Sequence, residues 1–248
     1  MTLKNFLKNN LPSFFLIFFY KILLCMRVLF WRVQIIYCPI CVKFKKTFYI
    51  GLFPWISLVC SGCLSLSRQR LIANYLKENS NLNKKKIIHF APEYALSKFI
   101  NKNYKIKKYD EVDLIPYKQT VRVNIENINK KYHDNYDLVM CNHVLEHVNF
   151  IRAISNLKKL VKKNGEILLT FPIVDSWEKN YINKKIKQQY DRSLHFQQFD
   201  HLQLFGREIE NYLIDKKFSC NKYIATGKES VKFGLIQGET LFVLKKIK

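Results

Sequence analysis

The chain has 248 residues, of which 48% are hydrophobic, 25% charged and 15% aromatic. This composition excludes an intrinsically disordered chain, and the length has room for one full-sized domain and a small module. The 42 basic and 19 acidic residues give a net charge of +23, which attracts the phosphates of nucleic acids, anionic lipids or sugar nucleotides. Because the lysines are spread in short pairs without a basic tail, we interpret most of this charge as solvated surface.

Residues 11 to 36 are strongly apolar, but Lys21, Arg27 and Arg32 interrupt the segment. Each cation at the centre of a membrane span costs about 2.5 to 3.5 kcal/mol, so spanning is not favoured. No small-residue cleavage site of a signal peptide follows. A helix in the membrane interface, a helix packed on the protein itself and a true span remain open, and we favour the first. It predicts peripheral membrane contact through residues 1–36, with the catalytic part in the cytoplasm, at the inner face of the membrane.

Four of the seven cysteines form two CxxC pairs, Cys38 with Cys41 and Cys60 with Cys63. A two-residue gap lets a tight turn direct both sulfurs at one ion, and two such turns complete a tetrahedron. We therefore expect a structural zinc site with four thiolate ligands in a reducing compartment. Rubredoxin-like iron and two local disulfides are the alternatives. Val42 follows the first pair, where such turns often have a glycine.

A helix is expected from Ser65 to Asn79, and a polar break follows it. We divide the chain into an apolar or amphipathic amino-terminal helix (1–36), a zinc ribbon plus helix (37–83) and a larger domain (84–248).

From Lys86 onward, short apolar strands alternate with helices, which is typical of an α/β fold with a parallel sheet covered by helices. The expected helices are Tyr94–Asn101 and Phe150–Lys163, the second ended by Lys163-Asn164-Gly165. The expected strands are Ile87–Ala91, one ending near Val112, Thr120–Ile125, Tyr136–Cys141, Glu166–Phe171 and a closing pair, Phe218–Ala225 and Thr240–Leu244. Ligands of such sheets bind beyond the carboxyl ends of the strands, at the switch point in strand order. The loops there contain His89–Glu93, Asp113, Asn124 and Cys141–His147.

The segment YDLVMCNHVLEHV, followed by a helix and LKKLVKKNGEILLTFP, resembles the fourth- and fifth-strand region of class I S-adenosylmethionine-dependent methyltransferases. The whole order resembles a type 11-like bacterial subfamily with an amino-terminal four-cysteine zinc ribbon, over roughly residues 37–248. The motifs that carry this resemblance are Ser-Leu-x-Arg-x-Arg at Ser65–Arg70, His-x-Ala-Pro-Glu at His89–Glu93, and Asp200-His201 before Phe205-Gly206. The resemblance implies a Rossmann-like class I methyltransferase sheet, with the zinc ribbon and a leading apolar helix in front of it.

The resemblance also implies S-adenosyl-L-methionine as methyl donor, beside structural Zn²⁺ in the ribbon. Two departures stand out: Ala91-Pro92-Glu93 replaces the usual glycine-rich first loop, and Asn124 stands where an aspartate is more usual. The implied donor contacts are His89, Ala91 and Glu93 around the methionine part, Asp113 at the ribose, Asn124 and Ile125 at the adenine, and Asn142 with His143 closing the pocket.

The loop after the fourth strand lacks the Asn/Asp-Pro-Pro-aromatic sequence of many amino-group nucleic-acid methylases. This favours a hydroxyl or carboxylate acceptor on a small molecule, a glycan or a lipid-linked molecule. Asp200 and His201 could form a pair that takes a hydroxyl proton, and we name them with His143 as catalytic candidates. Capping of a helix is the alternative for that pair. We expect Glu146 and His147 to brace a helix and Cys141 to be buried packing.

Two other functions remain open. An RNA methyltransferase would use the ribbon and the basic surface to hold RNA, which predicts salt-sensitive RNA binding. A non-catalytic, membrane-associated adaptor with a degenerate methyltransferase fold would not bind the donor. The acceptor, the methylated atom and the oligomeric state cannot be deduced from the sequence.

Overall fold

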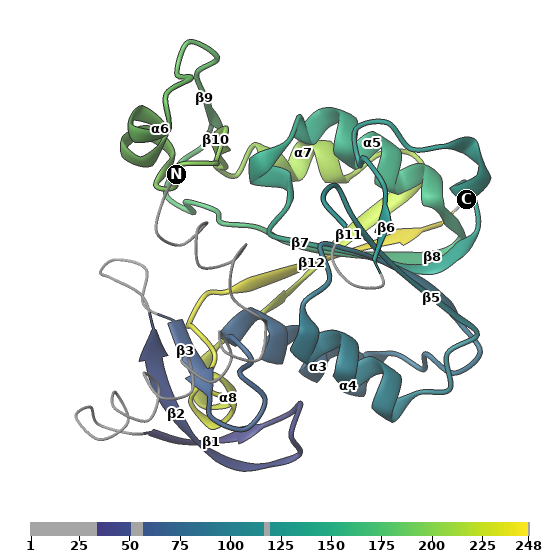
Figure 1. Ribbon diagram of the computed structural model, residues 1–248, viewed down its shortest axis with the longest axis vertical. Helices are drawn as coiled ribbons and strands as arrows, with labels where there is room; N and C mark the ends of the chain where they lie inside the picture. The colour runs from purple at the N-terminus through teal and green to yellow at the C-terminus, as the bar shows by residue number, and fades with distance from the viewer. Residues whose placement is uncertain (1–33, 51–56, 117–119, 248) are drawn as a thin grey trace.

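A computed structural model describes residues 34–50, 57–116 and 120–247. Within them a three-stranded sheet is followed by a seven-stranded sheet with helices on both faces (Figure 1). No helix in these three ranges is long and apolar enough to cross a membrane. The apolar segment predicted over residues 1–36 lies outside the described residues as far as position 33. Its last three residues are strand rather than helix, so the ribbon starts earlier than the predicted position 37.

The small sheet carries the cysteine pairs. Its antiparallel strands are β1 (Gln34–Cys38), β2 (Lys43–Ile50) and β3 (Ser57–Cys60), in the order β1-β2-β3. The first CxxC turn joins β1 to β2, because Cys38 is paired with Lys43. The second turn follows β3, which ends at Cys60. Ile36 and Leu58 are buried against the cysteines, so the cysteine side chains themselves form much of this small core.

The large sheet has the strand order β11-β12-β8-β7-β4-β5-β6. Its strands are β4 (Lys86–Phe90), β5 (Lys108–Asp113), β6 (Val121–Arg122), β7 (Tyr136–Asn142), β8 (Val161–Thr170), β11 (Phe218–Ile224) and β12 (Thr240–Lys246). The pairs from β6 to β8 are parallel, and β12 lies antiparallel between β8 and β11. Consecutive strands pass from β5 and β6 on one side of β4 to β7 and β8 on the other. The switch point is therefore between β4 and β7.

The largest differences from the predicted bounds are in the third strand and around the junction of α5 with β8. The third strand is shorter than the predicted Thr120–Ile125, although Val123 still donates to the Asp113 carbonyl at 2.9 Å. The helix predicted over Phe150–Lys163 ends at Leu160, and strand β8 begins at the next residue, Val161. The Asn164-Gly165 step makes a bulge within β8 instead of stopping the helix: Asn164 has φ 62°, and a Cβ on Gly165 would lie 2.9 Å from the Asp137 carbonyl.

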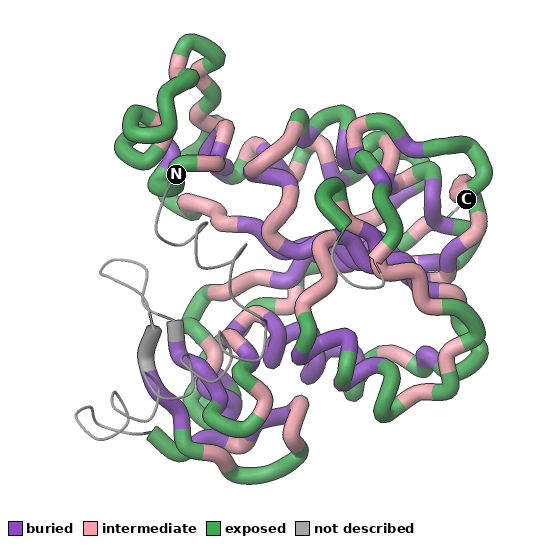
Figure 2. Tube along the Cα trace, in the orientation of Figure 1, coloured by how far each residue is buried: buried purple, intermediate pink, exposed green. Residues whose placement is uncertain are grey.

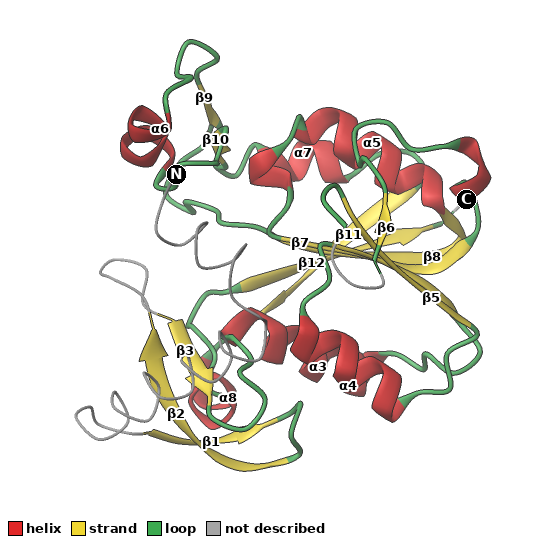
Figure 3. Cartoon of the chain, viewed as in Figure 1, coloured by secondary structure: helices red, strands yellow, loops and turns green. Residues whose placement is uncertain are grey.

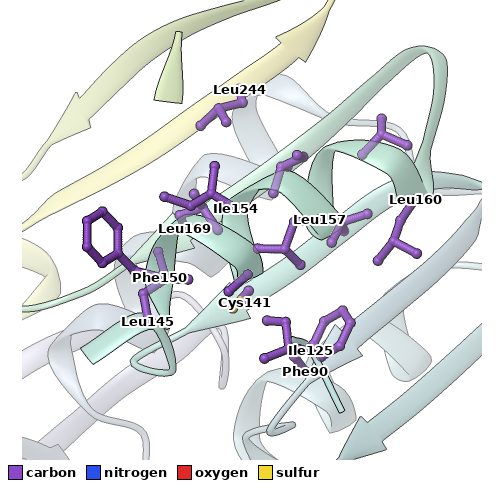
Figure 4. Packing of buried hydrophobic residues seen from close by; sticks show 14 of the residues in the cluster. Phe90, Ile125, Cys141, Leu145, Phe150, Ile154, Leu157, Leu160, Leu169 and Leu244 are labelled. Carbon is purple, nitrogen blue, oxygen red and sulfur yellow. The ribbon is translucent and has the colours of Figure 1, made fainter. Parts of the chain in front are cut away.

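Helices cover both faces of the large sheet (Figure 3). Helices α3 (Ser67–Asn79) and α4 (Tyr94–Asn103) pack on one face, and α5 (Phe150–Leu160) and α7 (Ile209–Leu213) on the other. Buried residues follow the sheet and the inner sides of these helices (Figure 2). In the α5 layer, Ile154 and Leu157 pack over the sheet with Cys141, which is fully buried as expected for a packing residue (Figure 4). The Asn149 side chain caps α5 by accepting from Arg152 N at 3.2 Å.

Residues 181–204, which lie between β8 and α7, form a separate projection beyond the carboxyl end of the sheet, at the upper left of Figure 1. It contains β9 (Tyr181–Ile182), α6 (Gln189–Phe196) and β10 (Gln203–Leu204), with β9 and β10 paired. The short helical turn η2 (Leu145–His147) follows β7 and contacts this projection: the Gln203 amide donates to the carbonyls of Leu145 at 2.7 Å and Val148 at 2.8 Å. A second short turn, η1 (Lys130–Tyr132), precedes β7, and α8 (Gly227–Phe233) precedes β12.

Candidate functional site

The four ribbon cysteines converge, as predicted from their spacing. All four sulfurs lie within 4.8 Å of one another, and the Sγ–Sγ distances are 3.7 Å for Cys38–Cys63 and 3.9 Å for Cys41–Cys60. A tetrahedron with Zn–S bonds of about 2.3 Å has edges of about 3.8 Å, whereas a disulfide needs about 2.05 Å. The separations therefore fit one tetrahedral thiolate-bound metal ion and exclude disulfides between these pairs.

The two CxxC turns have the same backbone geometry. The amide of Val42 donates to the Cys38 carbonyl at 2.8 Å, and the amide of Leu64 donates to the Cys60 carbonyl at 2.9 Å. Both donors have left-handed backbones, with φ 57° for Val42 and 61° for Leu64. A β-branched residue is strained in this region, which explains why glycine is common at the Val42 position.

Arg70 joins the ribbon to the large domain. Its side chain is fully buried, and every guanidinium nitrogen donates to a backbone carbonyl. The acceptors come from three parts of the chain: Leu58 at 3.0 Å in β3, Phe233 at 2.9 Å with Gly234 at the end of α8, and Ser65 before α3. Burial lowers the pKa of Arg70, and the nearby cysteine cluster acts in the opposite direction. This arginine is the last residue of the Ser-Leu-x-Arg-x-Arg motif.

The other residues of that motif reach the large domain. Ser67 Oγ accepts from the Ile236 amide at 2.8 Å and donates to the Glu239 carboxylate. Arg68 Nε lies 3.4 Å from Glu93 Oε1, in the loop after β4. The motif therefore places α3 between the ribbon and the loop in which we expect the methyl donor.

Glu93 is at the centre of a polar cluster beside the switch point. Its Oε2 lies 3.3 Å from His89 Nε2 and accepts from the Asn142 amide at 3.0 Å, and the Arg68 contact completes the cluster. His89 is fully buried, and its other ring nitrogen lies 2.8 Å from the Tyr109 hydroxyl. Burial of the Glu93 carboxyl raises its pKa, but His89, Arg68 and Asn142 outweigh this effect and hold the pKa below 4.5.

The loops after β4 and β7 both begin in the left-handed conformation. Ala91 has φ 47° and donates to the Val112 carbonyl at 2.9 Å, and His143 has φ 50° and donates to the Thr170 carbonyl at 2.7 Å. Ala91 lies in the loop where the sequence resemblance implies a glycine-rich turn. The backbone there has the left-handed conformation that glycine adopts freely, and alanine occupies it with one added methyl group.

The remaining predicted donor residues occupy the next loops along the same edge. Asp113 ends β5 and accepts from the Ile115 amide at 3.2 Å, and the exposed Asn124 accepts from the Glu126 amide at 2.9 Å. The Ile125 side chain is 5% exposed and belongs to the core, so it presents backbone rather than side chain to this edge. A carboxylate at a strand end beside left-handed loops fits a ribose-containing donor.

The three predicted catalytic residues are brought to the same edge in a different arrangement from the one expected. The Asp200 carboxylate accepts from the Gln198 amide at 2.7 Å and lies 3.6 Å from His147 Nδ1. His201 Nδ1 lies 3.0 Å from the Phe196 carbonyl, and burial lowers the pKa of this imidazole. Asp200 is thus a neighbour of His147, and the predicted Asp200–His201 pair does not form in this structure.

Glu146 and His147, which the sequence analysis assigned to bracing a helix, belong to a cluster with His201. Their ligand atoms lie within 4.8 Å of one another, and the rings of His147 and His201 are 4.7 Å apart. His143 is adjacent, with Nδ1 3.3 Å from Glu146 Oε1 and a side chain 30% exposed. In the sequence, the neighbouring Glu146 and His147 shortly after the central strand β7 were the signal that could have indicated this cluster. The third residue, His201, comes from a distant segment and could not be assigned to it from the sequence.

Comparisons with known proteins agree with this geometry. Residues 69–215 match the family described as methyltransferase domain. A protein of Methanocaldococcus jannaschii is 35% identical over 57 residues, a match that covers 23% of this chain and only 25% of the archaeal protein.

Solved structures show the same fold. An S-adenosylmethionine-dependent methyltransferase of Mesorhizobium loti is similar with a TM-score of 0.50 and 11% identity, over 71% of this chain and 97% of the other. The YcgJ protein of Bacillus subtilis also has a TM-score of 0.50, with 9% identity over 72% and 98%. The family match covers more than half of the chain, and the chain therefore belongs to the methyltransferase domain family.

Proposed function

We propose that the enzyme transfers the methyl group of S-adenosylmethionine to a hydroxyl or carboxylate oxygen of a small-molecule, glycan or lipid-linked acceptor. The observation that supports this is the cluster of three imidazoles and two carboxylates beside the donor edge. A hydroxyl nucleophile must lose its proton at or before methyl transfer, and imidazole is the side chain best suited to receive it near neutral pH. A carboxylate acceptor is already deprotonated at that pH and needs no base.

In this proposal the two sides of the switch point have different tasks. Asp113 holds the ribose of the donor, and the loop from His89 to Glu93 holds its methionine part. His143 accepts the acceptor's proton, because it lies between the two sides and remains partly exposed. The cysteine cluster holds a structural zinc ion, since four thiolates leave no open ligand position. Contact with a membrane through residues 1–36 stays a prediction.

Calorimetric titration of the full chain with S-adenosylhomocysteine tests the donor site. We expect micromolar binding, weakened at least tenfold in Asp113→Ala because the ribose hydroxyls lose their acceptor. Asp215→Ala is the matched control: this exposed carboxylate pairs with Lys158 at 2.6 Å beyond α7, away from the donor edge. Absence of binding by a folded, zinc-loaded wild type would contradict the proposal, as would equal binding by the two variants.

A further inference from the structure

The Glu146 carboxylate has no hydrogen-bond partner among the residues that the structure describes. The residue is 1% exposed, and neither carboxylate oxygen makes a hydrogen bond within the described part of the chain. His143 Nδ1 lies 3.3 Å from Oε1, close enough for attraction but without hydrogen-bond geometry. Burying an ionised carboxylate without a partner costs several kcal/mol. A residue in this state indicates a missing positively charged ligand.

Two histidines lie close to this carboxylate, and Nδ1 of each contacts a backbone carbonyl. Nδ1 of His201 faces the Phe196 carbonyl at 3.0 Å, and Nδ1 of His147 faces the Asp200 carbonyl at 3.2 Å. A carbonyl accepts a hydrogen bond, so each Nδ1 carries the proton and each Nε2 keeps its lone pair. Histidines that bind metals usually donate their second ring N–H to a carbonyl or carboxylate in this way.

The three residues are held together by backbone contacts between distant segments. The Leu202 amide donates to the Glu146 carbonyl at 2.9 Å, which fixes the projection after β8 against the turn after β7. The ligand atoms of Glu146, His147 and His201 consequently lie within 4.8 Å of one another. This arrangement is independent of the ribbon, whose metal ligands are all sulfurs.

We propose that Glu146, His147 and His201 bind a divalent transition-metal ion that holds the acceptor. One carboxylate and two imidazoles make a ligand set for Mn²⁺, Fe²⁺ or Zn²⁺ and leave coordination positions open. The inference rests on the proposed oxygen methylation and narrows the acceptor to a molecule whose hydroxyl binds this ion. The site begins four residues after Asn142, which belongs to the donor side.

The reaction then balances as follows. The metal-bound hydroxyl loses its proton to His143, because a bound cation lowers the pKa of a coordinated oxygen. The oxygen–carbon bond to the methyl group forms while the sulfur–carbon bond breaks. The electron pair of the broken bond stays on sulfur, which leaves S-adenosylhomocysteine and the methylated acceptor.

Titration of the full chain with Mn²⁺, followed by electron paramagnetic resonance, tests the site. The cysteine cluster is first loaded with one zinc ion per chain, because thiolates prefer zinc to manganese. We expect one bound Mn²⁺ per chain, at least tenfold weaker binding in Glu146→Gln and His201→Gln, and no change in Asp215→Asn. Elemental analysis after exposure to zinc should give two ions per chain in the wild type and one in both cluster variants.

Binding of S-adenosylhomocysteine, measured on the same samples, separates the two proposals. A wild type that binds the donor analogue but neither Mn²⁺ nor a second zinc overturns the metal site. Unchanged metal binding in Glu146→Gln and His201→Gln also overturns the metal site. Two variants are used so that the test still stands if one of them does not fold. Metal binding without binding of the donor analogue leaves the site standing and contradicts the proposed function.

Discussion

Two regions of the molecule each bury a charged side chain almost completely. One is the junction between the ribbon and the large domain, and the other is the cluster of Glu146, His147 and His201 beside the switch point. At the junction, every nitrogen of the Arg70 guanidinium donates to a carbonyl. In the cluster, Glu146 is equally buried, and its carboxylate has no hydrogen bond from any residue that the structure describes. A buried charge is tolerated only when it is compensated. The protein itself therefore compensates the charge of Arg70, whereas compensation of the Glu146 charge requires the ion that we propose to bind there.

Among the substitutions that test this comparison, replacement of Arg70 should lower the free energy of unfolding most. Arg70→Met leaves several buried carbonyls without a donor, and we expect the free energy of unfolding to fall by about 4 kcal/mol in urea denaturation. Arg68→Met is the matched control on the same helix: its side chain is 25% exposed and makes one ion pair, so the loss should stay below about 1 kcal/mol. Equal losses would show that Arg70 is not the residue that holds the junction.

Glu93 offers an intermediate case, a buried carboxylate whose partners are present. Glu93→Gln should lower the stability by about 2 kcal/mol at pH 7, because the carboxylate loses its ion pair with Arg68 and its contact with the buried His89. The folded pKa lies below the ordinary value of 4.5, so the unfolded chain binds more protons than the folded protein in acid. The stabilising contribution is therefore complete above pH 4.5 and is lost as the pH falls through the folded pKa.

Urea denaturation of both proteins between pH 7 and pH 3.5 measures this loss. The cysteine cluster is the same in both proteins, so its own sensitivity to acid cancels in the difference. A difference that grows as the pH falls would contradict the assignment.

Glu146→Gln should behave in the opposite way to Glu93→Gln. With zinc only in the cysteine cluster, we expect the variant to be more stable than the wild type by about 1 kcal/mol, because an unpaired buried charge is removed. Added Mn²⁺ should reverse the order, since only the wild type gains the stability of a bound ion. Thermal unfolding with and without Mn²⁺ checks both statements, and a variant less stable under both conditions would show that Glu146 already has a partner.

The smallest effect concerns strain within the ribbon. Val42→Gly should raise the stability by about 0.5 to 1 kcal/mol, because relief of the left-handed valine exceeds the added entropy of the unfolded chain. Leu64→Gly, at the equivalent position of the second turn, should gain less because leucine is not β-branched. Urea denaturation of the zinc-loaded proteins measures both, and a loss in Val42→Gly would contradict the strain argument.

How much the sequence could predict depended on how local each interaction is. The cysteine spacing was sufficient to predict the convergence of the four sulfurs, because two short turns bring them together. The alternation of strands and helices was sufficient to predict a parallel sheet covered by helices, whereas the strand order, and with it the position of the switch point, came from the structure. The orientation of His201 was not predictable, because it depends on the Phe196 carbonyl and on contact with Glu146 across the sheet edge. The predicted strand Thr120–Ile125 was too long: β6 is only Val121–Arg122, and the next residue, Val123, is buried in the core.

Helix α3 carries Arg70 toward the ribbon and Arg68 toward Glu93, two residues apart on one rigid element. We therefore expect occupancy of the ribbon by its proposed metal and occupancy of the proposed donor site to be linked through this helix. Thermodynamic linkage is reciprocal, so whatever the zinc adds to donor affinity, the donor adds equally to zinc retention. Under zinc limitation, the protein saturated with methyl donor should then keep its metal longest.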